Sequence, residues 1–304
     1  MLLCVCLLSG PTWAQAAEPY PNLPAGLNLL YQYDGNVLPL DQTTSIAGMT
    51  AGYGNRFGGG HVIVTDATAT IDPSSVYQQV YPAGTAGGNS PGQMNFWNTP
   101  SPRIPVTHYY EAIWFKINGA DFENPGTGPW KLLGFWAVGD PSGGGSNSLY
   151  QFVSCAHQVG STAAGLVCDT WTTAFDHQNF AVRRIDAGTV QNNKWYRMEI
   201  EMVMNTPVTS ANGVLKVWLT NVTDGGAATQ IINVANFVYR DPTHPDGVWL
   251  RHYDPTWGGG SPAPKTRNDS VNIARIVGYG NSSGTTPPPT DTTAPSPPTN
   301  VQAR

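Results

Sequence analysis

The stretch "WYRMEIEMVM" at residues 195–204 carries the clearest structural signal in the chain. Every second residue is large and apolar, namely Tyr196, Met198, Ile200, Met202 and Met204, whereas Arg197, Glu199 and Glu201 stand between them. Successive side chains of a β-strand point to opposite faces of the sheet, so this alternation is typical of a strand buried on one face. We expect the methionines to lie in a core and the charged residues to face outward.

The same period of two recurs along much of the chain. In "HYYEAIWFKI" (108–117) Tyr109, Ile113, Phe115 and Ile117 share one face, and "GVLKVWLT" (213–220) and "VNIARIVGY" (271–279) repeat the pattern. Clusters of Gly, Pro and Asn separate these segments, and no stretch shows a sustained helical period with caps. Regular strands without helices predict an all-β fold. At this length we expect a two-sheet antiparallel jelly-roll sandwich of the concanavalin A-like kind.

Composition narrows the class of partner. Only 12% of the 304 residues are charged, about half of the usual fraction, so Ser, Thr, Asn, Gln and Gly must form much of the surface. The formal net charge of −5 argues against nucleic acid or an anionic membrane as the partner. A surface of this kind suits an extracellular polysaccharide.

Both ends of the chain predict a secreted, modular protein. Residues 1–16 have a short apolar run and end in "AQA", which is typical of a signal peptide, and the run is too short to span a bilayer. We expect the jelly-roll domain over 17–279 and a Ser/Thr/Pro linker over 280–293. Residues 294–304, "APSPPTNVQAR", resemble the opening strand of a fibronectin type III domain that is cut short. The expected protein is a monomer within a multidomain secreted chain.

Cleavage of the signal peptide would leave Cys155 and Cys168 as the remaining cysteines. An even pair in an exported chain favours a disulfide. Closing this loop would contribute about 3 kcal/mol in the chain-entropy model.

Glu199 and Glu201 raise a glycoside hydrolase as one alternative. Their side chains point the same way, about 7 Å apart along a strand, and retaining glycosidases need two carboxyl groups about 5–5.5 Å apart. Concanavalin-like glucanases carry their carboxylates on one strand with an Asp between or after them, and "RMEIEMVMN" has none. The competing interpretation is a solvated outer face on which Arg197 neutralises its neighbours.

The sequence gives little indication of a metal site. The histidines lie far apart, without zinc-ligand spacing or a calcium-loop run. We expect no required cofactor, although a structural calcium held by loop carbonyls and Asp would be ordinary in this fold.

A further set of basic and phenolic residues lies beside aromatic residues. In "PWKLLGFW" (129–136), Lys131 is one cation among large apolar side chains. It either reaches water, pairs with a buried carboxylate, or faces a ligand. The other members are Tyr109, Tyr110, Gln151, His157, Arg183, Arg184, Arg251, His252, Tyr253 and Trp257, with Trp130 and Trp136 flanking Lys131.

The order of these segments resembles the jelly-roll polysaccharide lyases of the alginate and glucuronan lyase families. A strand of the type Y-x-v-x-F, a G-x-K-L-P-G segment, a W-to-N strand and an aromatic-Gly-Gly block follow one another in those families. The matching positions here are Tyr110, Phe115, Lys131, Leu132, Gly134, Trp195, Asn205, Gly213, Trp218, Trp257, Gly258 and Gly259. Leu133 stands where the family has Pro, and Trp257 replaces the usual Phe or Tyr.

The resemblance implies β-elimination on a uronic acid polymer. Such a reaction needs a cation or an amide donor beside the uronate carboxylate, which stabilises the negative charge that develops there. It also needs a group that removes the C5 proton. Burial among apolar rings would lower the pKa of Lys131, which suits a base or a water-excluded cation. The other candidate proton-handling residues are Tyr109, Tyr110, His252 and Tyr253.

Arg183, Arg184 and Arg251 are candidate carboxylate clamps. Gln151, His157, Trp130, Trp136 and Trp257 are candidate substrate contacts. A non-catalytic carbohydrate-binding or adhesion module of the same fold remains the main alternative, because several further tryptophans could stack on sugar rings.

Overall fold

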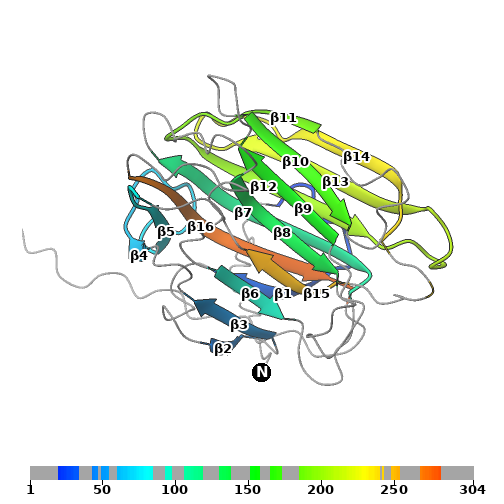
Figure 1. Ribbon diagram of the computed structural model, residues 1–304. Helices are drawn as coiled ribbons and strands as arrows, with labels where there is room; N and C mark the ends of the chain where they lie inside the picture. Colours follow the sequence, from blue (N-terminus) through cyan, green and yellow to red (C-terminus); the bar gives the residue numbers. More distant parts are fainter. Residues whose placement is uncertain are drawn as a thin grey trace, which may run out of the picture.

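The computed structural model describes two β-sheets and the segments that connect some of their strands (Figure 1). The described residues are 20–33, 43–46, 49–54, 60–84, 93–97, 106–118, 130–137, 151–157, 165–172, 185–239, 242, 248–253 and 268–281. Side chains are described for the first sheet and its connections, and the second sheet is described by its backbone. No helix occurs in this part of the chain.

The first sheet contains eight antiparallel strands. In spatial order they are β14 (Thr229–Phe237), β13 (Gly213–Asn221), β12 (Trp195–Val203), β7 (His108–Asn118), β16 (Asp269–Gly280), β5 (Val76–Tyr81) and β4 (Gly60–Val64), and β1 (Asn28–Tyr33) also pairs with β16. The central pair β7 and β16 comes from segments far apart in the sequence.

The second sheet also contains eight antiparallel strands. Their order is β11 (Ile185–Thr189), β10 (Gly165–Thr172), β9 (Gln151–His157), β8 (Trp130–Ala137), β15 (Val248–Tyr253), β6 (Gln93–Trp97), β3 (Met49–Gly54) and β2 (Thr43–Ile46). The two sheets lie one over the other as the layers of a sandwich (Figure 1). The expected all-β, two-sheet antiparallel architecture is confirmed.

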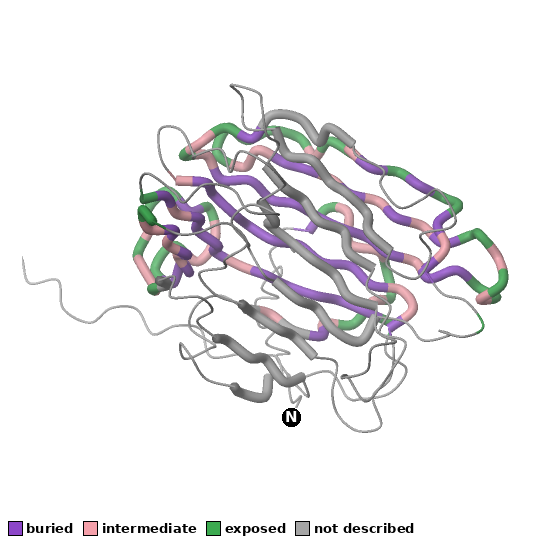
Figure 2. Tube along the Cα trace, in the orientation of Figure 1, coloured by how far each residue is buried: buried purple, intermediate pink, exposed green. Residues whose placement is uncertain are grey.

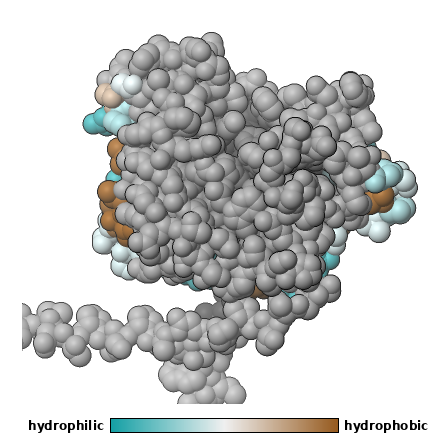
Figure 3. Space-filling model, turned by 60° about the horizontal axis from the view of Figure 1, so that its bottom comes forward, coloured by the Kyte–Doolittle hydropathy of each residue, from teal (hydrophilic) through white to brown (hydrophobic). Residues whose placement is uncertain are grey.

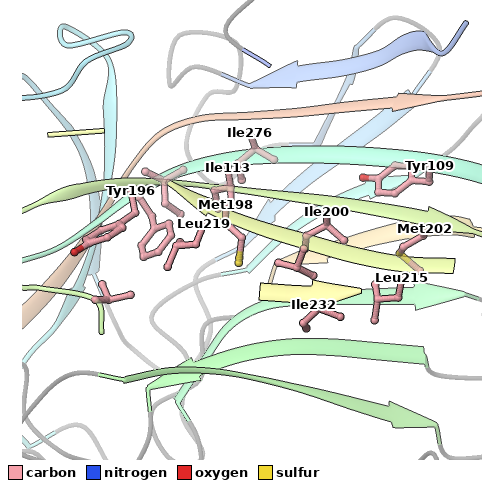
Figure 4. Packing of buried hydrophobic residues seen from close by; sticks show 14 of the residues in the cluster. Tyr109, Ile113, Tyr196, Met198, Ile200, Met202, Leu215, Leu219, Ile232 and Ile276 are labelled. Atoms are coloured by element: carbon pink, nitrogen blue, oxygen red, sulfur yellow. The ribbon is translucent and has the colours of Figure 1, made fainter. Parts of the chain in front are cut away.

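The predicted alternation places the main core on the inner face of the first sheet, which is turned toward the second sheet. Met198, Ile200 and Met202 of β12 are buried there with Tyr109 and Ile113 of β7, and Figure 4 shows these side chains packed in one layer. The strands β7, β12 and β16 are buried along most of their length (Figure 2). Burial of such large side chains contributes about 1.5–3 kcal/mol each.

A second, smaller core lies on the outer face of the first sheet. Tyr110, Ala112 and Trp114 of β7 are buried there with Trp195 of β12. Two chain segments cover them, residues 20–29 and residues 64–71, which contribute Tyr20, Leu23, Leu27, Leu29, Val64, Ala69 and Ile71. The ring of Tyr20 packs edge-on against Trp114, with centroids 5.5 Å apart. The central part of this face is therefore closed to solvent.

Asn281 closes the end of the fold directly after β16. Its side-chain oxygen accepts hydrogen bonds from the backbone N–H groups of Thr107 and His108, each at 3.0 Å. Its side-chain nitrogen donates to Thr107 Oγ1 at 2.8 Å, and its own N–H donates to the carbonyl of His108. Residue 281 is thus fixed to the start of β7.

The strands expected from the alternation are confirmed as β7, β12, β13 and β16, and "PWKLLGFW" (129–136) provides all but the last residue of β8. The predicted signal peptide and fibronectin-like segment lie outside the described residues and stay predictions, as does the predicted linker (280–293) from residue 282 on. Its first two residues are part of the fold, because Gly280 ends β16 and Asn281 bonds Thr107 and His108. None of the described residues belongs to a helix of membrane-spanning length and apolarity.

Candidate functional site

Glu199 is the centre of a buried hydrogen-bond network on the outer face of the first sheet. Its carboxylate is 0% exposed and accepts hydrogen bonds from Tyr110 Oη at 2.5 Å and from Arg197 Nε at 2.9 Å. Asn22 donates to it twice, through the side chain at 3.0 Å and the backbone N–H at 3.2 Å. Arg197 does neutralise its neighbour, as expected, but the prediction that this face is solvated is wrong because residues 20–29 cover it.

Glu201 also has structural partners. Its two oxygens contact His108 Nε2 at 3.0 Å and Lys216 Nζ at 2.8 Å. The hydrogen bond with His108, together with that from Lys216, lowers the pKa of Glu201 although burial opposes the shift. Both carboxylates of the hydrolase alternative are therefore engaged in ion pairs, and Glu199 has no access to a substrate. These contacts do not support that alternative.

The two tyrosines named as candidate proton-handling residues are buried on opposite faces of β7. Burial, reinforced by the adjacent Glu199 carboxylate, raises the pKa of Tyr110 far above its usual range, so the phenol stays protonated near neutral pH. Tyr109 lies in the main core and donates to Glu111 Oε2 at 2.6 Å. These surroundings do not support a proton-transfer role for Tyr109 or Tyr110.

Ion pairs hold the second covering segment in place. Asp66 binds the ammonium of Lys116 and accepts a hydrogen bond from Asn272 Nδ2 at 2.8 Å. Burial alone would raise the pKa of Asp66, but these bonds and those from Thr68 lower it. Asp72 pairs with Arg275 through both carboxylate oxygens, at 2.7 and 2.8 Å. The middle of the outer face is thus occupied by the protein itself, which leaves the second sheet as the place for a central site.

Strand order in the second sheet brings most of the remaining candidates together. β9, β8 and β15 are consecutive neighbours, and they carry Gln151 and His157 (β9), Trp130, Lys131 and Trp136 (β8), and Arg251, His252 and Tyr253 (β15). In register, Trp130 is opposite His157, and His252 is opposite Gly134. Figure 1 shows these strands side by side. Positions more than a hundred residues apart in the sequence therefore meet at the centre of one sheet.

The backbone is irregular at Lys131. Residue 131 pairs with Ala156, whereas Leu133 pairs with Cys155, so the register shifts between these two positions of β8. Such β-bulges are over-represented next to active sites, because they change the direction of a side chain and bend the strand. A second register shift lies in β15 between Val248 and Leu250, so irregular backbone occurs in both strands that carry the central candidates.

The register also bears on the predicted disulfide. Cys155 and Cys168 are direct partners in the β9–β10 pairing. Opposite positions in an antiparallel pair have Cα atoms about 4.5–5.5 Å apart, which matches the separation a disulfide requires. The bond itself stays a prediction. Arg183, Arg184 and Trp257 lie outside the described residues.

One neighbour of this group was missed by sequence reasoning. Asn95 of β6 is opposite His252, and Gly52 of β3 is opposite Asn95. Asn95 stands in the short segment "QMNFW" (93–97), whose alternation is too brief to predict a strand. Only the strand order connects it with β15. Within the described side chains, no group of three or more His, Cys, Asp or Glu residues could hold a metal ion.

No protein-family model matches this chain, and comparison with curated proteins finds no match. Solved structures do share its fold. The marine PL-14 alginate lyase from Aplysia kurodai is 14% identical and aligns with a TM-score of 0.50 over 75% of this chain and 90% of its own. A variant of alginate lyase Aly36B in complex with alginate trisaccharide is 12% identical, with a TM-score of 0.51 over 83% of this chain and 97% of its own.

The chain has the jelly-roll fold of these lyases. At this identity the similarity establishes the fold alone, and it confirms the fold that the ordered segments implied.

Proposed function

We propose that this protein is a secreted polysaccharide lyase that cleaves a uronic-acid-containing polymer by β-elimination. The observation that carries the proposal is the strand order that brings Lys131 of β8 and His252 of β15 onto adjacent strands and, by register, onto one face of the second sheet. The same register assigns His157, Arg251 and Tyr253 to the other face. The shared fold with alginate lyases supports it. Because the chain itself covers the central part of the outer face of the first sheet, the second sheet is the favoured location of the site.

The residue types on β8 and β15 suit this chemistry. Removal of the C5 proton leaves negative charge that spreads onto the adjacent carboxylate, so a cation beside that carboxylate lowers the barrier. A guanidinium matches a carboxylate with two parallel hydrogen bonds, but Arg251 directly precedes His252 in β15 and so belongs to the other face of the sheet. Lys131 or His252 supplies the cation in this proposal. Lys131 and His252 are the candidates for removing the proton and for protonating the leaving O4 atom.

Replacement of Lys131 tests the proposal. The wild-type chain is incubated with alginate, glucuronan and pectate, and the unsaturated product is followed by its ultraviolet absorbance. Lys131→Ala should lower turnover about 100-fold or more if the lysine acts in proton transfer, with an unchanged melting temperature. Lys194→Ala is the matched control, because Lys194 pairs with an exposed Asp224 at the surface, and it should keep full activity.

The alternatives give different results in the same assay. A glycoside hydrolase releases reducing ends without ultraviolet absorbance, and a binding module is retarded in a polysaccharide gel without forming product. Either result, or an active Lys131→Ala variant, would contradict the proposal.

A further inference from the structure

Among the described residues, the cover on the outer face of the first sheet contacts β7 and β12, and β13 and β14 are the next strands of the sheet. Along β13, Leu215 and Val217 are buried in the main core, whereas Lys216 and Trp218 point to the outer face and are partly exposed. The strand pairing places Gln230 of β14 opposite Trp218. Trp218 is thus partly exposed on the outer face of the sheet, opposite Gln230.

Two amide side chains flank this indole. Gln230 and Asn233 are exposed, and they are opposite Trp218 and Lys216 respectively. The register of β14 shifts between these two positions, where a bulge inserts Ile231. Within the described residues neither amide forms a side-chain hydrogen bond, so both can donate to and accept from a ligand.

The charges around Trp218, Gln230 and Asn233 are compatible with an acidic ligand. The nearby carboxylates are neutralised internally, Glu199 by Arg197 and Glu201 by Lys216. The side chain of Lys216 remains 33% exposed while that of Glu201 is 9% exposed. The positive partner of the pair is therefore the one that faces solvent.

We propose that Trp218, Gln230 and Asn233 form a second polysaccharide-binding surface, separate from the strands that carry Lys131. An aromatic face stacks on the apolar face of a sugar ring, and neighbouring amides bond its hydroxyl or carboxylate groups. The surface lies on the outer face of the first sheet, on the opposite layer of the sandwich from β8. It holds the polymer while the other sheet is free to act, and it does not depend on the proposed lyase activity.

Gel retardation tests this surface directly. The full chain is run on native gels that contain alginate, glucuronan or a neutral glucan, and the dissociation constant is taken from the dependence of mobility on polymer concentration. Trp218→Ala should weaken binding to at least one polymer about tenfold, and Trp218→Phe should retain most of it. Val62→Ala is the control, because Val62 on β4 is 44% exposed. Hydrophobic residues gather at the left margin of Figure 3, the side on which β4 lies in Figure 1.

A second variant guards against loss of fold, because Trp218 is partly buried. Gln230→Ala combined with Asn233→Ala changes only exposed side chains and should weaken binding at least threefold with an unchanged melting temperature. Wild-type mobility for both Trp218→Ala and the double variant would overturn the proposal, as would a wild-type chain that no polymer retards. Loss of binding in Trp218→Ala with normal product formation in the Lys131 assay would separate the two surfaces.

Discussion

Replacing Glu199 by Gln tests whether the buried network holds the N-terminal segment on the sheet. Oε1 accepts from Tyr110 and from the backbone of Asn22, and Oε2 accepts from Arg197 and from the side chain of Asn22. Glutamine has the same shape, but one of its two terminal atoms is an NH₂ group that cannot accept. Whichever way the amide lies, two donors lose their acceptor.

The magnitude follows from the burial of this site. A hydrogen bond to a charged group contributes about 1.5–3 kcal/mol, and breaking a buried ion pair by removing one partner costs about 3–5 kcal/mol. The hydroxyl of Tyr110 can rotate to accept from the new amide, which recovers part of the loss. We therefore expect Glu199→Gln to lower the free energy of unfolding by about 3 kcal/mol.

Urea unfolding at pH 7, followed by tryptophan fluorescence, measures this change. Asp224→Asn is the matched control, since it removes a carboxylate from an exposed pair with Lys194 and should leave the unfolding midpoint unchanged. If Glu199→Gln unfolds at the same midpoint as this control, Glu199 does not stabilise the covering segment and the reasoning is refuted.

Two further predictions concern acid stability and packing. Because the folded pKa of Glu201 lies below its ordinary value of 4.5, its contribution is complete above about pH 4.5 and is lost as the pH falls through the folded pKa. The difference in unfolding free energy between wild type and Glu201→Gln should therefore shrink between pH 7 and pH 3, and a constant difference would contradict this. At Gly213, a Cβ atom would lie 2.6 Å from the carbonyl oxygen of Phe237 and 3.0 Å from that of Val203. Gly213→Ala should cost about 1–3 kcal/mol in urea unfolding, and a wild-type midpoint would show that the backbone adjusts freely.

The strands of the first sheet could be predicted because their alternation is a local property. In β12, Met198 and Ile200 identify the inner face without knowledge of any partner strand. Whether the outer face is exposed to solvent could not be predicted in this way. Asn22 lies 177 positions from Glu199, and nothing in "WYRMEIEMVM" indicates that another segment will cover its charges. A charged residue between apolar ones indicates an outward direction, but not exposure to water.

For a similar reason, the candidate site residues could be named from the sequence, but their positions relative to one another could not. Composition and aromatic neighbours indicated Lys131, His157 and His252 one by one, but only the order β9–β8–β15 shows that they lie on neighbouring strands. The same reasoning named Tyr109 and Tyr110 without indicating that both are buried, because a tyrosine in a buried strand and one in an open cleft have the same local pattern. Asn95 shows the converse, since its neighbour His252 becomes evident only from the register.

The hydrogen bonds that fix Asn281 to Thr107 and His108 have a mechanical consequence. Tension on anything attached after residue 281 first meets four hydrogen bonds to Thr107 and His108. Behind them lies β16, which is paired with β7 on one side and with β1 and β5 on the other. A strand bonded along both edges resists being pulled lengthwise, because many bonds must break at once. A pull at this point therefore loads β16 along its whole length, and the first sheet resists being peeled open.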